Sequence, residues 1–174
     1  EGELLARAVI DASGTFLQPN PLGASGLPAR GEGAAGEAGL VVAGLPEILG
    51  PERAAYSGRS VAVVGGGHSA IHALLDLAEL REQAPETRIA WILRKADPVR
   101  SFGGGAKDQL AERGRLGLRL RELVESGALS LHSGFRAEAV ELEGAAGPGR
   151  EDGALQVRLR DGERSIGPFD RVIV

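Results

Sequence analysis

A glycine-rich stretch, residues 65–70, lies between an apolar run and a helical pattern. Residues 61–64 are continuously apolar and mostly β-branched, which predicts a strand buried on both faces of a parallel sheet. The stretch has the spacing G-x-G-x-x-G/A, in which the first glycine permits a tight turn and the second lets the backbone approach a pyrophosphate. A small third residue lets helix and strand pack closely. The pattern predicts a dinucleotide site formed by Gly65, Gly66, Gly67, His68, Ser69 and Ala70.

The polar side chains of this stretch have both functional and ordinary interpretations. Ser69 offers a hydroxyl donor to a phosphate, or is a common first-turn residue of a helix. His68 is placed to touch the pyrophosphate or the nicotinamide, or to pack locally. His72 follows at the i, i+4 spacing of some metal sites, but the sequence offers no identifiable carboxylate or thiol partner. We therefore expect neither a metal site nor a catalytic side chain in this chain.

The next apolar run, residues 89–93, predicts a second strand at 88–93 that ends at two basic residues, Arg94 and Lys95. An acid at this position accepts hydrogen bonds from the ribose hydroxyls of NAD, whereas an arginine accommodates the 2′-phosphate of NADP. Arg100 follows nearby, and Glu86 lies before the strand, at the wrong end. Since guanidinium donors form a rigid fork that suits phosphate, these residues predict NADPH rather than NADH. The alternative is a solvated strand end, where basic residues are common.

Composition bounds the kind of protein. The chain has 174 residues and 43% hydrophobic content, enough for one domain with extensions. A net charge of -4 and a pI near 5.5 argue against nucleic acid as a partner. No apolar run approaches the length of a membrane span and no signal peptide is recognisable, so we expect a cytoplasmic protein. The lack of cysteine excludes dithiol chemistry in this chain, and the lack of methionine predicts a piece of something longer.

Hydrophobic periodicity predicts alternating strands and helices. Besides the strands at 60–64 and 88–93, we expect strands at 7–13, 40–43, 129–132 and 169–174. Helices are expected at 69–83 and 106–125, with a helical turn at 46–49. Residues 16–39 are rich in glycine, alanine and proline and predict an irregular segment that crosses between domains. The glycine triplet 103–105 predicts a flexible break between elements.

Period-two alternation begins at residue 135. The runs 135–142 and 155–160 alternate apolar and polar residues around a Gly-Pro-rich loop, which predicts an antiparallel meander, and a turn at 161–162 leads to a further short strand. The predicted fold is α/β: a Rossmann-like three-layer domain with a parallel sheet plus an antiparallel β-meander. We expect residues 1–57 to be a junction segment and connector, and residues 58–174 to be the nucleotide-binding domain.

Four segments together resemble a known family. They are Asp-Ala-Ser-Gly-Thr at 11–15, a loop with Pro19 and Pro21, the turn with its preceding strand at 63–70, and Asp-Arg-Val-Ile-Val at 170–174. The pattern resembles the NAD(P)H-binding domain of two-dinucleotide-binding-domain flavoproteins, the superfamily of flavin-containing monooxygenases and pyridine nucleotide-disulfide oxidoreductases. In that superfamily the NAD(P)H domain is inserted into an FAD domain. The resemblance therefore implies FAD in a full-length parent, with the FAD domain as partner.

The sequence departs from the family pattern in three places. The glycine-rich entry of the FAD domain is absent, which implies that this piece does not hold FAD alone. Residues 53–59 lack the histidine of the Baeyer-Villiger and flavin-monooxygenase fingerprint. The resemblance therefore supports flavin reduction better than oxygen insertion. The cysteine pair of thioredoxin reductases is also missing.

The expected function is the NADPH-binding portion of an FAD-dependent oxidoreductase. It would position nicotinamide so that hydride passes from its C4 to flavin N5, with the cofactors supplying the chemistry. The alternative is a non-catalytic nucleotide-binding or interaction domain with a Rossmann-like fold. The small-molecule substrate does not follow from the sequence.

Overall fold

The computed structural model describes residues 7–8, 19–102, 111–144 and 154–174. The family-like segment 11–15, most of the strand expected at 7–13 and the glycine triplet 103–105 lie outside the described residues. So do the first five residues of the helix expected at 106–125.

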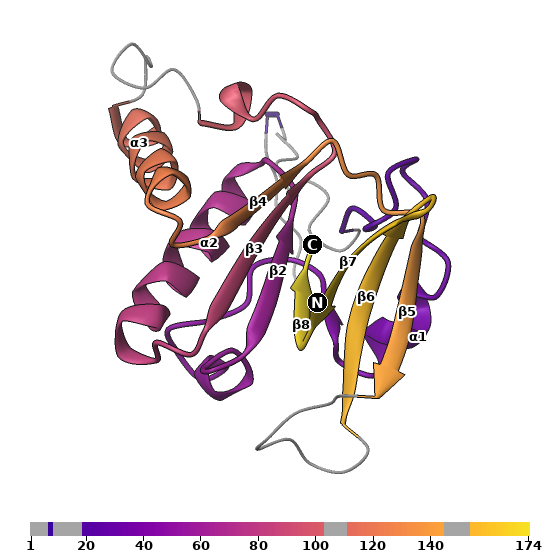
Figure 1. The fold of residues 1–174 in the computed structure, drawn as a ribbon. Helices are drawn as coiled ribbons and strands as arrows, with labels where there is room; N and C mark the ends of the chain where they lie inside the picture. Colours follow the sequence, from indigo (N-terminus) through magenta and orange to yellow (C-terminus); the bar gives the residue numbers. More distant parts are fainter. Residues whose placement is uncertain (1–6, 9–18, 103–110, 145–153) are drawn as a thin grey trace.

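Two sheets and two long helices form three layers (Figure 1). The parallel sheet has the order β1-β8-β2-β3-β4, and the antiparallel sheet has the order β5-β6-β7. The parallel strands are β1 (Val41–Val42), β2 (Ser60–Val64), β3 (Arg88–Leu93), β4 (Ser130–Ser133) and β8 (Arg171–Ile173). The antiparallel strands are β5 (Ala139–Gly144), β6 (Leu155–Asp161) and β7 (Arg164–Phe169). The helices are α1 (Glu32–Glu37), α2 (His68–Gln83) and α3 (Ala111–Glu125), with 3₁₀ turns η1 (Arg53–Ala55) and η2 (Val99–Phe102).

The parallel sheet is covered on both faces because its strands are apolar on both. Val61, Val63 and Trp91 pack with the leucines of α2 and with Leu120 of α3 in one cluster. The alternate residues, among them Ala62, pack in a second cluster with the apolar face of the meander. Successive side chains of a strand point to opposite faces of the sheet, so one set of apolar residues packs against the helices and the alternate set packs against the meander. The predicted fold class is confirmed.

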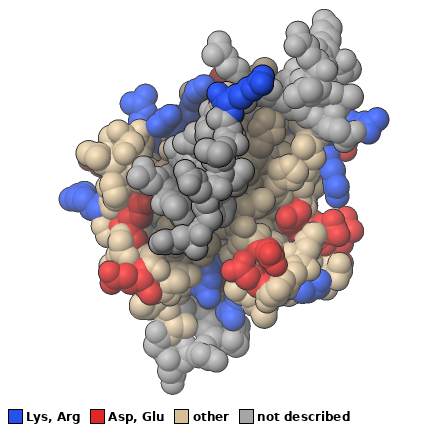
Figure 2. Space-filling model, turned by 180° about the vertical axis from the view of Figure 1, so that it is seen from behind, with Lys and Arg blue, Asp and Glu red and all other residues tan. Residues whose placement is uncertain are grey.

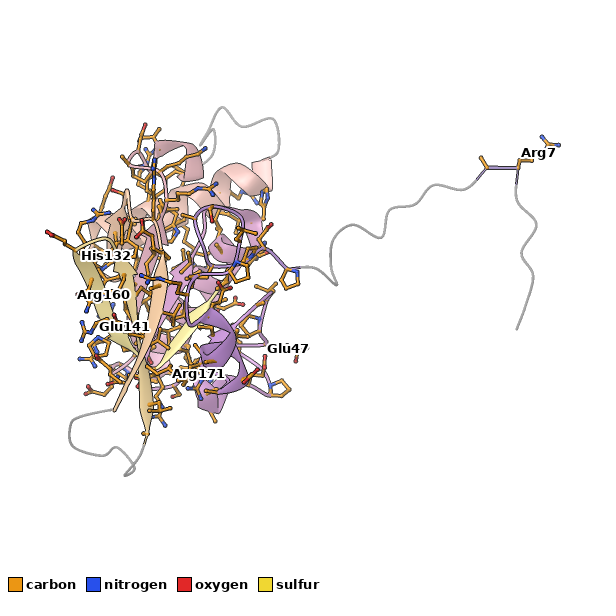
Figure 3. All side chains as sticks on the ribbon, turned by 90° about the vertical axis from the view of Figure 1, so that its right-hand side faces the viewer. Arg7, Glu47, His132, Glu141, Arg160 and Arg171 are labelled. Atoms are coloured by element: carbon orange, nitrogen blue, oxygen red, sulfur yellow. The ribbon has the colours of Figure 1, made fainter. Side chains whose placement is uncertain are left out.

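The outer face of the meander is charged. Arg158 pairs with Glu143 and Arg160 with Glu141, with nitrogen–oxygen distances of 2.8 and 2.9 Å. Figure 3 shows Glu141 and Arg160 close together on this sheet. Such exposed pairs are screened by solvent, so they mark the solvated face rather than hold the fold together. In the described part of the chain no helix has the length and apolar character needed to cross a membrane.

Four expectations about elements were wrong in detail, and the first is the strand expected at 135–142, which begins only at Ala139. The stretch 16–39 is not irregular throughout, because it contains α1, and the Glu32 carboxylate accepts the N–H groups of Leu22 and Ala29 at 2.8 and 2.6 Å. The helical turn expected at 46–49 forms later, at η1. The strand expected at 169–174 is divided between two sheets, because Asp170 separates β7 from β8.

Candidate functional site

The glycine turn lies where the order of the parallel strands reverses. The chain passes from β2 through α2 to β3 on one side, while β8 and β1 lie on the other side of β2. The Gly65 N–H donates to the Ile92 carbonyl at 3.0 Å, which holds the turn beside the carboxyl end of β3. In open α/β sheets, ligands bind in the crevice outside the carboxyl ends of the strands at such a switch point.

Gly65 has a conformation that other residues rarely adopt. Its φ is 130°, and a β-carbon there would lie 3.8 Å from that of Ala70, an ordinary contact distance. Because only glycine readily adopts this φ, the first position of the motif is set by the backbone. Ala70 is 7% exposed, so the third position of the motif requires a small residue because it is closely packed.

Trp91, in the neighbouring strand β3, holds the glycine turn by a hydrogen bond. Its indole Nε1 donates to the Gly65 carbonyl at 2.7 Å, and the side chain is fully buried. The ring meets Phe102 edge to face, with centroids 5.6 Å apart. The hydrogen bond fixes the carbonyl of the first motif residue, and so the direction in which the chain leaves β2.

We expect Trp91→Phe to lower the free energy of unfolding by about 2 kcal/mol, because it removes the donor to the Gly65 carbonyl and leaves a small cavity. Urea unfolding followed by circular dichroism measures the change. Leu118→Ala, at a residue 42% exposed on α3, is the control and is expected to change stability by less than about 0.5 kcal/mol. Equal stability of both variants would contradict a supporting role for the indole.

Gly67 differs from Gly65, because nothing in the described chain requires it to be glycine. Its φ is -87°, and an added β-carbon would meet no atom within 4 Å. Gly66, Gly67, His68 and Ser69 are all exposed. Gly67 is the N-cap of α2 and makes no side-chain cap hydrogen bond. The first main-chain N–H groups of a helix lack intrahelical acceptors, so this open turn presents donors and the positive end of the helix dipole.

The histidines are spread over different surroundings. His68 and His72 are exposed on the first turns of α2, and burial raises the pKa of Asp76 by more than the neighbouring His72 lowers it. His132 lies half-buried in β4, and burial lowers its pKa. Among the described residues no three histidine or carboxylate side chains cluster as metal ligands would.

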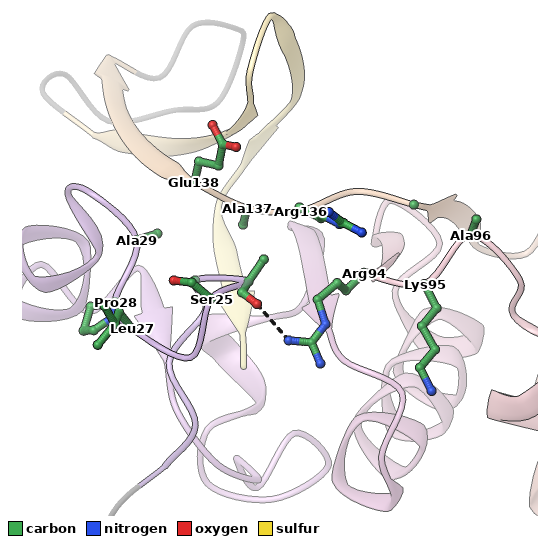
Figure 4. A pocket seen from close by; sticks show the side chains of 13 residues that line it. Ser25, Leu27, Pro28, Ala29, Arg94, Lys95, Ala96, Arg136, Ala137 and Glu138 are labelled. Atoms are coloured by element: carbon green, nitrogen blue, oxygen red, sulfur yellow. Dashed lines mark hydrogen bonds between the residues drawn. The ribbon is translucent and has the colours of Figure 1, made fainter.

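The two basic residues at the end of β3 are exposed and border a cleft. Arg94 donates from Nη1 to the Ala24 carbonyl at 2.9 Å, and Lys95 follows it on the same border (Figure 4). Asp97, the nearest acid in sequence, is not among the cleft residues, and its carboxylate accepts the N–H of Val99 at 2.9 Å. Arg100 lies in η2, and its side chain is outside the described part of the structure.

The cleft has a volume of about 900 Å³, and no residue of the glycine turn borders it. Its borders are the end of β3, the segment between β4 and β5, and an upstream loop: Gly23, Ala24, Ser25, Leu27, Pro28, Ala29, Arg94, Lys95, Ala96, Gly134, Arg136, Ala137 and Glu138. Sequence reasoning missed the upstream loop and Arg136. The one signal for the loop was the unusual length of an irregular segment, which is typical of functional loops.

The charges in the cleft favour an anion. Arg94, Lys95 and Arg136 border it, with one acid, Glu138. The Glu138 carboxylate accepts the N–H of Gly162 at 3.3 Å, and Figure 4 shows it directed away from Arg94 and Lys95. Small-molecule sites have volumes of about 300–1,000 Å³, so the cleft has the size and charge for part of a nucleotide.

Asp161 is the acid electrostatically coupled to Arg136, and it is already paired. Its carboxylate bonds to the Arg164 side chain, which lowers its pKa, and it also accepts the Arg136 main-chain N–H at 3.1 Å. Within the described residues the Arg136 side chain makes no ion pair. The face seen in Figure 2 carries both basic and acidic side chains, with basic ones along its upper edge and acidic ones mainly in its lower half.

Comparison with known proteins gives matches among solved structures. No protein-family model matches the chain, and no curated protein matches it. An FAD-bound cadaverine monooxygenase of desferrioxamine biosynthesis from Erwinia amylovora matches 89% of this chain and 41% of its own length, with a TM-score of 0.54 and 14% identity. A thioredoxin reductase from Gloeobacter violaceus matches 85% of this chain and 36% of its own, with a TM-score of 0.50 and 19% identity.

A pyridine nucleotide-disulfide family oxidoreductase from Enterococcus faecalis V583 matches 77% of this chain at a TM-score of 0.47 and 13% identity. The chain covers 25% of that protein, so it spans less than half the length of each of these three structures. At such identities the matches report fold. The fold expected from the resemblance seen in the sequence is confirmed: the chain shares its fold with part of the Erwinia amylovora monooxygenase and part of the Gloeobacter violaceus thioredoxin reductase.

Proposed function

We propose that this chain is the NADPH-binding portion of an FAD-dependent oxidoreductase. The observation that carries the proposal is the open turn at Gly67, on the carboxyl edge of a parallel sheet. A β-carbon added to Gly67 would have no atom of the described chain within 4 Å, so the space beside the turn is free for a ligand. Residues 65–70 would hold the pyrophosphate with main-chain N–H groups. Arg94, Lys95 and Arg100 would select the phosphorylated ribose.

The chain's contribution is binding and orientation. When bound, NADPH supplies a hydride, which a flavin held by the rest of the protein accepts. The donors at the start of α2 fix the phosphates, and the carbonyl-anchored Arg94 fixes one end of the nucleotide. No side chain of the described residues is assigned as an acid or a base.

The flavin part of the proposal is supported by the neighbours. The Erwinia amylovora monooxygenase is an FAD-bound protein, and this chain matches 41% of its length. We propose that the remainder of such a flavoprotein is the partner, with residues 1–57 as the junction from its flavin-binding half and residues 58–174 as the NADPH domain. The small-molecule substrate would be bound by that remainder.

Exchange of a single charge tests the cofactor preference. The 174-residue chain is expected to bind NADPH at least about tenfold more tightly than NADH, and Arg94→Asp to abolish the difference, because a hydrogen bond between charged groups contributes roughly 1.5–3 kcal/mol. Isothermal titration of both nucleotides measures this. Arg88→Asp, at an exposed residue on the opposite end of β3, is the matched control.

Two results would contradict the proposal. An unchanged preference in Arg94→Asp would remove the argument for NADPH. Absence of binding for both nucleotides would remove the dinucleotide site itself. The alternative, a nucleotide-binding module without redox chemistry, predicts that NADPH binds but leaves the flavin absorption of the longer protein unbleached.

A further inference from the structure

The cleft beside β3 has two walls of different chemistry. One wall is cationic, with Arg94 and Lys95 at the end of the strand and Arg136 in the segment between β4 and β5. The other wall is apolar and comes from the upstream loop, where Leu27 and Pro28 are exposed. Figure 4 shows Leu27 and Pro28 on the opposite side of the cleft from Lys95.

Leu27 is unusual among the apolar side chains. It is 68% exposed, the largest value for a large hydrophobic residue in the described chain, and it is one of the residues that border the cleft. A ligand with an apolar face that rests on this side chain would remove its surface from water and so bind more tightly. A ligand that also carries phosphate would meet the cations opposite.

The loop that carries Leu27 is built to a fixed shape. The Ala24 N–H donates to the Ala137 carbonyl at 3.1 Å, and the Ala24 carbonyl accepts the Arg94 guanidinium at 2.9 Å. A β-carbon on Gly23 would lie 1.9 Å from the Leu27 carbonyl oxygen, so the loop folds tightly on itself. Both walls are therefore held at a set separation before any ligand arrives, which lowers the entropic cost of binding.

We propose that Leu27 and Pro28 form the adenine-binding wall of this cleft, with the adenosine phosphate of the dinucleotide facing Arg94, Lys95 and Arg136. The inference rests on the proposed function and extends it. It assigns recognition of the base to a segment outside the strand–turn–helix unit. A purine fits the requirement because it is planar, presents apolar faces, and in a dinucleotide is joined to phosphates that match the cationic wall.

Substitution of Leu27 separates this inference from the proposed function. In the 174-residue chain, Leu27→Ser is expected to weaken the binding of both NADPH and NADH about tenfold. This corresponds to about half of the free energy gained when a leucine side chain is fully buried. The ratio of the two affinities should stay as in the wild type. Reduced nicotinamide mononucleotide, which lacks adenosine, should bind equally to both chains. Isothermal titration measures all three ligands.

Leu45→Ser is the matched control, since Leu45 is 53% exposed and does not border the cleft. Unchanged NADPH affinity in Leu27→Ser, or an equal loss in Leu45→Ser, would overturn the adenine wall and leave the proposed function standing. A wild-type chain that binds neither NADPH nor NADH would overturn both. Because Leu27 is mostly exposed, Leu27→Ser is expected to have the circular dichroism spectrum of the wild type.

Discussion

Replacing Gly67 with alanine is expected to weaken NADPH binding roughly a hundredfold while the chain keeps its stability. The space beyond Gly67 contains no atom of the described chain within 4 Å of an added β-carbon, and its φ of -87° suits alanine. The free energy of unfolding should therefore fall by no more than about 1 kcal/mol, the difference between glycine and alanine at a helix N-cap. A pyrophosphate held by the neighbouring N–H groups would, however, collide with the new methyl group.

Gly65→Ala provides the contrast in the same turn. At a φ of 130° an L-residue is strained, so this variant should lose both binding and about 1–3 kcal/mol of stability. Isothermal titration with NADPH and urea unfolding separate the two outcomes. Wild-type affinity in Gly67→Ala would show that the turn does not hold the phosphates, and the proposed site would have to be abandoned.

Removal of the Asp170 carboxylate is expected to destabilise the fold by about 3–5 kcal/mol. Asp170 is 4% exposed and lies where the chain passes from the meander to the parallel sheet. Its Oδ2 accepts the Ser60 N–H at 2.8 Å, and its Oδ1 accepts the side-chain amide of Gln156 at 3.1 Å. Gln156 is itself 3% exposed, so Asp170→Ala leaves two buried donors without acceptors.

Denaturant unfolding of Asp170→Ala beside Glu141→Ala measures this effect. Glu141 is a half-exposed carboxylate whose pairing with Arg160 contributes roughly 0–1 kcal/mol, which makes it a charge-matched control. Asp170→Asn retains one acceptor oxygen and should lie between the two. If Asp170→Ala unfolds at the same denaturant concentration as Glu141→Ala, the carboxylate does not join the two sheets.

The strands at 60–64 and 88–93 were predictable to the residue because each contains a compact apolar run, 61–64 and 89–93, with a clear stop. The first ends at glycines and the second at Arg94. The helix Glu32–Glu37 was not predictable, since its glycines and alanines give no hydrophobic period. What orders the region around that helix is a pair of hydrogen bonds to Glu32, one of them from a residue ten positions away.

The candidate site likewise has one part that the sequence predicted and one part that it did not. The order of strand, turn and helix along the sequence was enough to place the glycine turn at the carboxyl edge of the sheet. The cleft required contacts that no local pattern encodes. Arg94 and Ala24 are 70 residues apart, and Arg136 reaches the cleft from the segment before the meander. Tertiary folding therefore supplied the apolar wall and the third cation.

The hydrogen bond from Trp91 to Gly65 has a practical consequence. The chain contains a single tryptophan, and that indole is bonded directly to the first residue of the motif. Its fluorescence is thus an intrinsic optical probe of the proposed diphosphate site, free of signal from any other tryptophan. Each titration of this chain can be followed at that one position without attaching a dye.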